Sequence, residues 1–504
     1  MPASIGRPSH PPPGHHGWCG LTIGRMNQTR TTSTDWSGLA RGLDGTLLRP
    51  GEEGYGVARL PYNSRFEVHP RAVVFAQGVE DVRETLAFAR RHGLPLAARS
   101  GSHSYGGWST SPGITLDLGR MNAVATGAGT ATIGGGALLI DAYDALLAEN
   151  LSIPAGSCPT VGIAGLTLGG GLGSVCRAYG LTCDRLVSAV VVTADGRIRQ
   201  CSAEREPELF WALRGGGGGN FGVVTGFTFR THPTTEVTRA SLQWSWRDAA
   251  RVVDAWQRWA PTRPDEEWSC LGLSAEPTGG CTVAVSLYVL GDGPDVADTL
   301  VAAVGIEPVE QRSEVISYRE MIMSMTGSQG TVSQLHLTGR TPDAVLDRPP
   351  FVAASNFFPV HLPAAGIRAL VAAVARRAAD GGPGYVLLDS LRGAVGRVAP
   401  DATAFVHRDA LFSAQYHCMF DPGTPAAALD RAARWLRGLR RAMRPWAGDS
   451  AYVNYADPYL DDYARAYYGA NLPRLVAVKA AYDPDGFFDF PQAVPPRRAG
   501  ASPR

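Results

Sequence analysis

The 504-residue chain has almost no excess of charge and no long hydrophobic run. Its 47 basic and 46 acidic residues leave a formal net charge of +1, so nothing indicates a nucleic-acid or acidic-membrane partner. No stretch reaches the roughly 18 uninterrupted apolar residues of a membrane span. The first 34 residues lack the apolar core of a secretory signal. We therefore expect a cytoplasmic protein that binds neither nucleic acid nor membrane.

The eight cysteines follow no repeated spacing. This scatter argues against a disulfide framework and against a zinc site, and it favours buried, reduced thiols. The sequence also lacks the phosphate loop G-x-x-x-x-G-K-[ST], the zinc motif H-E-x-x-H and the redox motif C-x-x-C. We expect no bound metal.

Glycine, in contrast, is abundant, with 60 residues, and it is densest in residues 154–173, PAGSCPTVGIAGLTLGGGLG. Glycine adopts positive φ and lets a backbone approach a ligand closely. The stretch is uncharged and carries one cysteine, Cys158, just before a proline. Two interpretations follow with similar weight. Either the main chain lies against a flat or anionic cofactor, or it forms a tight loop in a β-rich core.

A second small-residue loop, residues 99–107, follows a predicted β-α-β unit. Residues 72–76 and 94–99 have the character of buried strands, and apolar residues at helical spacing lie between them, before Gly93. A loop of Gly and Ser after a strand offers backbone N–H groups and hydroxyls to a pyrophosphate. His103 in this loop either points at a cofactor or is a loop histidine bonded to backbone.

The third glycine run, residues 215–222, contains Gly217, Gly219 and Gly222 in the spelling G-x-G-x-x-G. A Rossmann fingerprint needs a strand before the glycines and a helix after them. Here a helix is predicted before the run and a strand after it, so we reject the Rossmann interpretation. Upstream, Ala194-Asp195-Gly196 between two apolar runs predicts a hairpin.

From about Val237 the glycine runs stop, and alternating strands mixed with amphipathic helices predict an α+β domain with helices on one face of an antiparallel sheet. Long strands are expected over 385–395 and 404–419. For His407 and Arg408 we favour a solvent-facing position or a structural ion pair. The tyrosines near the end of the chain either pack between domains or supply a base of lowered pKa.

Several motifs taken together resemble the berberine bridge enzyme-like FAD-linked oxidases of the vanillyl-alcohol oxidase / p-cresol methylhydroxylase superfamily. The resemblance covers residues 62–494, and it is carried by residues 99–107, 155–173, 177–184, 215–224, 403–408, 452–457 and 468–484. It implies a two-domain α+β flavoprotein of the vanillyl-alcohol oxidase type. Its parts are a disordered or poorly ordered extension (1–55, with Met26 an alternative start), an FAD-binding domain (56–236), an antiparallel-sheet substrate domain (237–445), a segment returning to the FAD domain (446–494) and a tail (495–504).

The resemblance further implies FAD bound through two covalent links. His103 matches the histidine bonded to the 8α-methyl carbon, and Cys158 the cysteine bonded to carbon 6 of the isoalloxazine. A neutral imidazole and a thiolate are the nucleophiles that such links need. Cys176 and Cys183 do not match the linking position. The remaining cofactor contacts that the resemblance implies are Arg99, Ser100, Gly101, Ser102, Ser104, Tyr105, Gly162, Gly165, Gly169, Gly170, Gly173, Val224 and Asn454.

For catalysis, the resemblance makes Tyr455 the proton-abstracting base, with Asp389 assisting it, Gln415 contacting flavin or substrate, and Tyr452 in support. Val161 matches the position that controls access of oxygen to the flavin in this family, and a valine there is similar to the residue found in the oxidases. Two departures, Leu172 in place of an aromatic residue and Arg392 in place of a glycine, bear on the substrate and leave the flavin links untouched.

The expected reaction is hydride transfer from an alcohol-type carbon of a sugar or secondary metabolite to FAD. Reoxidation by oxygen would then give hydrogen peroxide. A dehydrogenase of the same fold, an oxidative cyclase and a non-catalytic flavin- or ligand-binding protein remain as alternatives. The oligomeric state is not predicted.

Overall fold

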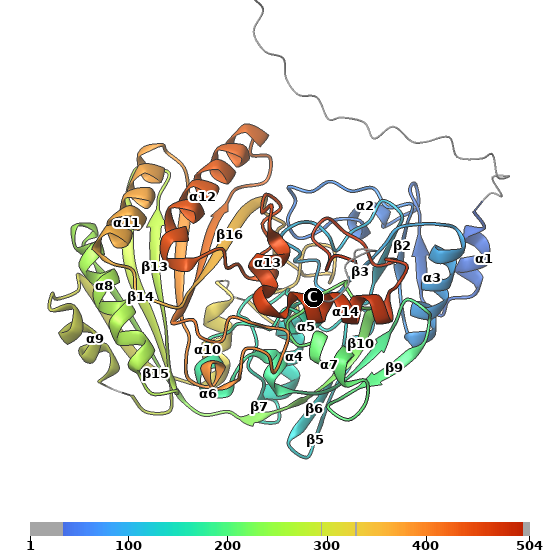
Figure 1. Ribbon diagram of the computed structural model, residues 1–504, viewed down its shortest axis with the longest axis horizontal. Coiled ribbons are helices and arrows are strands. Elements are labelled where there is room, and N and C mark those ends of the chain that lie inside the picture. Colours follow the sequence, from blue (N-terminus) through green and yellow to red (C-terminus); the bar gives the residue numbers. More distant parts are fainter. Residues whose placement is uncertain (1–33, 294, 328–329, 497–504) are drawn as a thin grey trace, which may run out of the picture.

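The protein consists of two halves that lie side by side, each built on its own β-sheets (Figure 1). The computed structural model describes residues 34–293, 295–327 and 330–496. The combination of separate sheets with helices packed on their faces confirms the predicted α+β class.

The first half contains a four-stranded sheet, a five-stranded sheet and a two-stranded ribbon. In spatial order the strands are β1 (Thr46–Leu48), β2 (Ala72–Phe75), β4 (Ile114–Asp117) and β3 (Leu96–Arg99); β5 (Val124–Gly127), β6 (Thr130–Gly134), β10 (Val223–Arg230), β8 (Leu186–Val192) and β9 (Ile198–Cys201); and β11 (His232–Pro233) with β7 (Leu151–Ser152). Its helices are α1 (Trp36–Arg41), α2 (Tyr55–Ala58), α3 (Val79–Arg91), α4 (Leu139–Leu147), α5 (Ile163–Leu168), α6 (Cys176–Tyr179) and α7 (Pro207–Ala212).

The predicted β-α-β unit is present as β2, α3 and β3, and both strands run parallel to β4, which lies between them. The glycine run at 215–222 follows α7 and precedes β10, as expected for a loop that is not a Rossmann fingerprint. The hairpin predicted around Asp195 is the β8–β9 pair.

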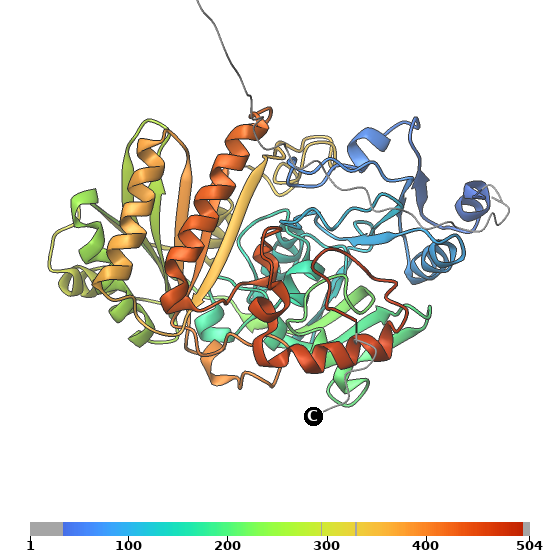
Figure 2. The same cartoon turned by 45° about the horizontal axis from the view of Figure 1, so that its top comes forward.

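The second half is a seven-stranded antiparallel sheet with helices on one face. In spatial order its strands are β15 (Glu310–Ile316), β12 (Val237–Trp244), β14 (Cys281–Leu290), β13 (Glu267–Ala275), β17 (Gly384–Ser390), β18 (Phe412–Met419) and β16 (Phe351–Phe358). Helices α8 (Ala249–Trp259), α9 (Val296–Val304), α11 (Ala364–Ala379) and α12 (Ala426–Ala447) cover the face turned away from the first half, and α12 runs along β16 (Figures 1 and 2). Helix α10 (Tyr318–Met325) packs against the first half.

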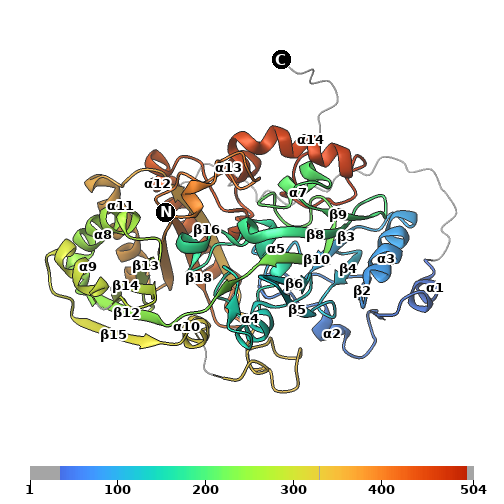
Figure 3. The ribbon, with the colours of Figure 1, turned by 90° about the horizontal axis from the view of Figure 1, so that it is seen from below.

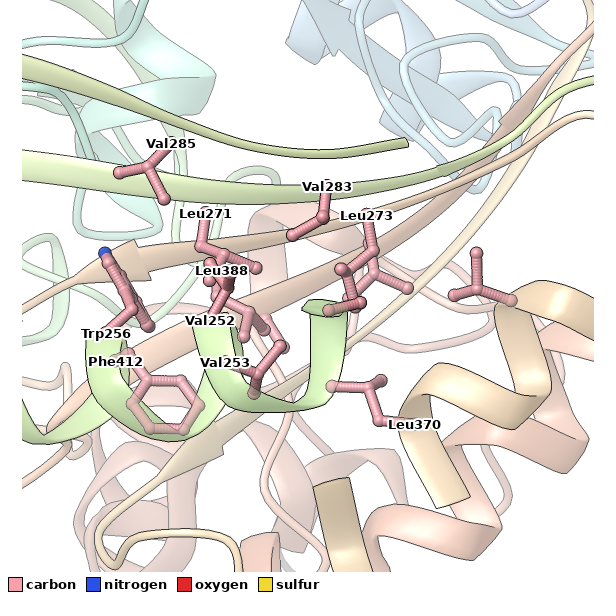
Figure 4. Packing of buried hydrophobic residues seen from close by; sticks show 14 of the residues in the cluster. Val252, Val253, Trp256, Leu271, Leu273, Val283, Val285, Leu370, Leu388 and Phe412 are labelled. Atoms are coloured by element: carbon pink, nitrogen blue, oxygen red, sulfur yellow. The ribbon is translucent and has the colours of Figure 1, made fainter. Parts of the chain in front are cut away.

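The largest hydrophobic core lies between this sheet and its helices. Alternate strand residues such as Leu271, Val285 and Leu388 point toward Val252 of α8 and Leu370 of α11 (Figure 4). Because side chains alternate across a strand, the neighbouring positions are directed at the other face, which meets the first half.

The C-terminal segment returns to the first half. A short 3-10 helix, η5 (Val453–Tyr455), is followed by α13 (Tyr463–Tyr468) and α14 (Leu472–Tyr482), and α14 lies against α7 (Figure 3). The predicted domain boundaries at residues 237 and 446 fall beside the start of β12 and the end of α12. The division into domains at these residues stays a prediction. No helix in the part of the chain that the structure describes is long and apolar enough to cross a membrane.

Four expectations need correction. Residues 34–55, predicted to be poorly ordered, form α1 and β1, because Trp36 packs on Phe88 and β1 pairs with β2. Residues 1–33, with the alternative start at Met26, and most of the tail lie outside the described residues. The strand predicted over 385–395 ends at Ser390, before a turn with positive φ at Arg392 and Gly393.

The strand predicted over 404–419 begins only at Phe412. In the preceding loop, the buried guanidinium of Arg408 makes two 2.7 Å hydrogen bonds to Asp184. The structural ion pair favoured for Arg408 is therefore present, and the solvent-facing alternative for this residue is wrong.

Candidate active site

A cavity of about 770 Å³ is lined by residues of both halves. The first half contributes the loops 99–105 and 156–174 and residues 218–224, the second half contributes the inner face of β13, β14, β17 and β18, and the C-terminal segment contributes residues 452–456. A site between domains with aromatic walls and a few polar groups is typical of a cofactor and small-molecule site.

The loop after β3 presents unpaired hydrogen-bond donors to this cavity. The backbone N–H groups of residues 101–106 have no acceptor among the residues that the structure describes. Ser102, in the same loop, has φ +65° and a buried hydroxyl without a partner. Successive N–H groups in a left-handed turn form an anion-binding concavity. The loop therefore fits the diphosphate of FAD.

The glycines of residues 154–173 keep the backbone of that stretch close to the loop after β3. A Cβ added to Gly162 would lie 2.1 Å from the hydroxyl of Ser100, and one added to Gly101 would lie 2.2 Å from the nitrogen of Gly162. At Gly165, which lines the cavity, a Cβ would meet nothing within 4 Å. The open space beside Gly165 is thus available to a cofactor, which supports the first of the two interpretations of residues 154–173.

His103 is held in one orientation on the cavity wall. Its ring stacks on Tyr62 with centroids 3.7 Å apart, and its Nε2 lies 2.6 Å from the hydroxyl of Thr160. Burial lowers the pKa of His103 to about 3. The imidazole is therefore neutral at ordinary pH, and the contact of Nε2 with Thr160 leaves Nδ1 as the ring nitrogen open to another group.

Cys158 is exposed to the cavity although protein surrounds it on the other sides. This desolvation raises the pKa of its thiol, and a hydrogen bond with Ser157 partly opposes the rise. Tyr62 lines the cavity and stacks on His103, and Thr160, two residues after Cys158, contacts the same imidazole. The two predicted linking residues therefore lie in one region of the cavity, and Tyr455 lines the same cavity.

Tyr455 lies in an aromatic group at the junction of the halves. Its ring is stacked with Tyr105 at 5.4 Å and meets Tyr452 edge-on at 4.9 Å. Gln415 donates its Nε2 hydrogen to the Tyr105 hydroxyl at 2.8 Å. Burial is the main reason that the pKa of Tyr455 is raised well above 10, and the nearby Tyr105, Asp389 and Tyr452 add to this rise.

The hydroxyl of Tyr452 connects the C-terminal segment to the glycine-rich stretch. Its hydroxyl accepts hydrogen bonds from the backbone N–H of Gly171 at 2.9 Å and from the Asn454 side chain at 3.0 Å. The bond from Gly171 ties the C-terminal segment to the glycine-rich residues 154–173, and the bond from Asn454 braces Tyr452 within its own segment. The C-terminal segment is thereby fixed against the first half next to Tyr455.

Asp389 is half-buried on the inner face of the sheet and lines the same cavity. Burial raises its pKa from 3.8 to about 6, while hydrogen bonds from Cys270 and Ser413 oppose the rise. A carboxyl group with a pKa near neutrality can exchange a proton at working pH.

The structure brings most of the predicted site residues to the cavity, but not all of them. Gly169 and Gly170 do not line it, because Gly169 packs against Asn454 and Gly170 packs against Phe405 with φ +117°. Arg99 lines it, but its guanidinium is bonded to Asp117 at 2.8 Å. The predicted residues that do line it are His103, Cys158, Ser100, Gly101, Ser102, Ser104, Tyr105, Gly162, Gly165, Gly173, Val224, Asn454, Tyr455, Asp389, Gln415 and Tyr452.

Other residues that line the cavity, or that hold a lining residue in place, were missed from the sequence. Tyr62 and Thr160 hold His103, while Trp268, Tyr288 and His417 line the wall formed by the second half. Thr160 could have been suspected from its place two residues after Cys158. The strand residues had no such signal, because each is a single residue on a separate strand.

The comparisons with known proteins agree with the geometry. Residues 70–202 match the FAD binding domain family, and residues 451–495 match the family described as berberine and berberine like. The FAD-linked oxidoreductase YgaK of Bacillus subtilis is 32% identical, with 90% of this chain and 98% of the relative aligned. Berberine bridge enzyme-like 12 of Arabidopsis thaliana is 30% identical, over 93% of this chain and 92% of the relative.

Among solved structures, a carbohydrate oxidase from Microdochium nivale in complex with a substrate analogue superimposes with a TM-score of 0.81. It is 25% identical, and the match covers 92% of this chain and 99% of that structure. The unpaired N–H groups of the loop after β3 and the open space beside Gly165 fit FAD. The sequence matches extend over nearly the whole chain. The protein is an enzyme of the berberine bridge enzyme-like family of FAD-linked oxidoreductases.

Proposed function

We propose that this enzyme is an oxidase that acts on an alcohol-type carbon of a carbohydrate or polyhydroxylated secondary metabolite, with FAD held covalently by His103 and Cys158. The observation that carries the proposal is that these two residues share one region of the cavity with Tyr455. His103, Cys158 and Tyr455 all line this cavity, and Thr160, whose hydroxyl lies 2.6 Å from Nε2 of His103, is two residues after Cys158.

The two linking residues have suitable chemistry. The imidazole of His103 is neutral and keeps Nδ1 open, and Cys158 is exposed and lines the cavity. Both are nucleophiles that can bond to electron-poor carbons of the isoalloxazine, His103 to the 8α-methyl carbon and Cys158 to ring carbon 6. Once bound, the isoalloxazine would supply the hydride acceptor for the reaction.

The protein would supply the proton acceptor. Tyr455 has a strongly raised pKa, so it cannot act as a free phenolate near neutral pH. We propose that it takes the substrate hydroxyl proton while passing its own proton toward Asp389. The pKa of Asp389 near 6 leaves this carboxylate ionised at neutral pH and able to accept a proton.

The substrate wall supports a polyhydroxylated compound. Trp268 and Tyr288 lie in a stacked arrangement with centroids 6.0 Å apart and provide apolar surface, while Gln415 and His417 provide polar groups. Leu172 lines the cavity where sugar-oxidising relatives have an aromatic residue. The likeness to the Microdochium nivale carbohydrate oxidase favours a carbohydrate.

Val161 lines the cavity and is half-buried. A valine at this position supports oxygen as the acceptor, and hydrogen peroxide is then the second product.

The test has two stages. The purified enzyme is first mixed without oxygen with a panel of mono- and oligosaccharides and polyphenols, and bleaching of the flavin absorbance identifies a substrate. Oxygen is then admitted, and restored absorbance with one peroxide per turnover is expected. Bleaching without reoxidation by oxygen would instead indicate a dehydrogenase, and no bleaching by any carbohydrate would reject the substrate class.

A further inference from the structure

The carboxylate of Asp389 lies between two hydrogen-bond donors from neighbouring strands. Asp389 on β17 is directly opposite Cys270 on β13 and Ser413 on β18. Directly opposed residues of antiparallel strands point to the same face, with their Cβ atoms about 5 Å apart. All three side chains therefore share the inner face of the sheet.

The two donors differ in strength and in place. Ser413 is buried, and its hydroxyl lies 3.5 Å from Oδ2 of Asp389, at the limit of a hydrogen bond. Cys270 lines the cavity directly opposite Asp389, so its thiol is placed to donate a hydrogen bond to the carboxyl group, an interaction that opposes the rise in the pKa of Asp389. A buried carboxylate without a cation depends on such donors to stay ionised.

Among the residues that the structure describes, no cation compensates the charge of Asp389. The titratable groups that interact with it from the surrounding elements are Cys270 on β13, Cys176 on α6 and Tyr455 in η5. None of these is positively charged, and within the described part of the chain no lysine, arginine or histidine contributes to its pKa. Small changes in a single hydrogen bond can therefore decide its protonation state.

We infer that Cys270 is a positioning residue for the reaction: its thiol holds the Asp389 carboxylate ionised and fixed in orientation so that it can receive the proton from Tyr455. The inference rests on the proposed function, since it needs Asp389 to act with Tyr455. A thiol is a weaker donor than a hydroxyl, and this chain uses the weaker donor on the cavity side.

The test exploits this difference. In Cys270→Ser the stronger donor should shift the acidic limb of the flavin-reduction rate to lower pH, and in Cys270→Ala the lost donor should shift it to higher pH, by about half to one unit each. The rate is measured anaerobically in the holoenzyme with the substrate found above. Because the serine variant is nearly isosteric, its profile is informative even if the alanine variant folds poorly.

Cys281, a half-buried thiol on β14 outside the cavity, provides the matched control. Cys281→Ser and Cys281→Ala should keep the profile of the parent enzyme. Shifts of opposite sign in the two Cys270 variants would support the inference. Unshifted Cys270 profiles, with flavin reduction still slowed by Asp389→Asn, would overturn it and leave the proposed function standing. An Asp389→Asn variant with undiminished rate would reject the proposed proton route itself.

Discussion

The ring of Tyr105 stacks on the ring of Tyr455 with centroids 5.4 Å apart and an angle of 20° between the planes. Tyr105 belongs to the donor-rich loop after β3, and Tyr455 belongs to the segment that returns from the second half. This contact joins the loop proposed to hold the diphosphate to the residue proposed to take the substrate proton. The chain thus closes the site with two segments from its opposite ends.

Removing the Tyr455 hydroxyl should slow the chemical step. We expect Tyr455→Phe to reduce the rate of flavin reduction by about 10²- to 10⁴-fold, which is the usual contribution of a positioned acid–base group. Stopped-flow absorbance under anaerobic conditions measures this rate. The flavin spectrum should stay that of the parent enzyme, because the ring stack with Tyr105 is kept. A variant that reduces its flavin at the full rate would exclude Tyr455 as the base.

The raised pKa of Asp389 predicts an acidic limb. Its ionised form, which predominates above the pKa of about 6, is the form that can accept a proton. The rate of flavin reduction should therefore be highest above pH 6 and approach a tenfold loss per pH unit well below it. Asp389→Asn should be slow at every pH and lack this limb. If the limb persists in Asp389→Asn, another group is responsible for it.

The two proposed covalent links predict how the flavin is lost. Acid-precipitated parent enzyme should keep its yellow colour in the pellet, as should His103→Ala and Cys158→Ala, since each single variant retains the other link. Only the double variant should release its flavin to the supernatant. Cys176→Ala, which removes a buried thiol beside the same cavity, serves as control and should retain the flavin. Release from the parent enzyme would show that neither link forms.

The open space beside Gly165 predicts a selective loss of cofactor. In Gly165→Leu the side chain would project into the cavity, where a Cβ meets no protein atom within 4 Å. We expect a folded protein with less than about a tenth of the parent's flavin, because the backbone of a helix tolerates leucine better than glycine. Gly438→Leu, on an exposed and equally open position of α12, is the control. Full flavin content in Gly165→Leu would place the cofactor elsewhere.

The ion pair of buried Arg408 with half-buried Asp184 predicts a stability effect. Arg408→Met should lower the free energy of unfolding by about 3 kcal/mol, because it leaves a largely enclosed carboxylate without its arginine partner. Arg444→Met removes an exposed ion pair with Asp449 and should cost at most about 1 kcal/mol. Chemical unfolding followed by tryptophan fluorescence measures both. Equal costs for the two substitutions would contradict the structural role of Arg408.

The sequence by itself predicted the α+β class, the second antiparallel sheet and the two loops that carry His103 and Cys158. These features are local. Glycine density, the alternation of apolar residues, and a helix before and a strand after a glycine run each depend only on neighbours in the chain. The same locality explains the errors. Residues 404–411 were predicted as strand from their apolar character, yet they form the loop in which Arg408 reaches Asp184.

Only the tertiary structure decided which side chains meet. The sequence allowed Gly169 and Gly170 as cofactor contacts, but packing against Asn454 and Phe405 turns them away from the cavity. The placing of Cys270 beside Asp389 depends on the register of β13 with β17. A one-residue shift of that register would send one of the two side chains to the opposite face. No local pattern encodes this register, because it is set by the packing of the whole sheet on its helices.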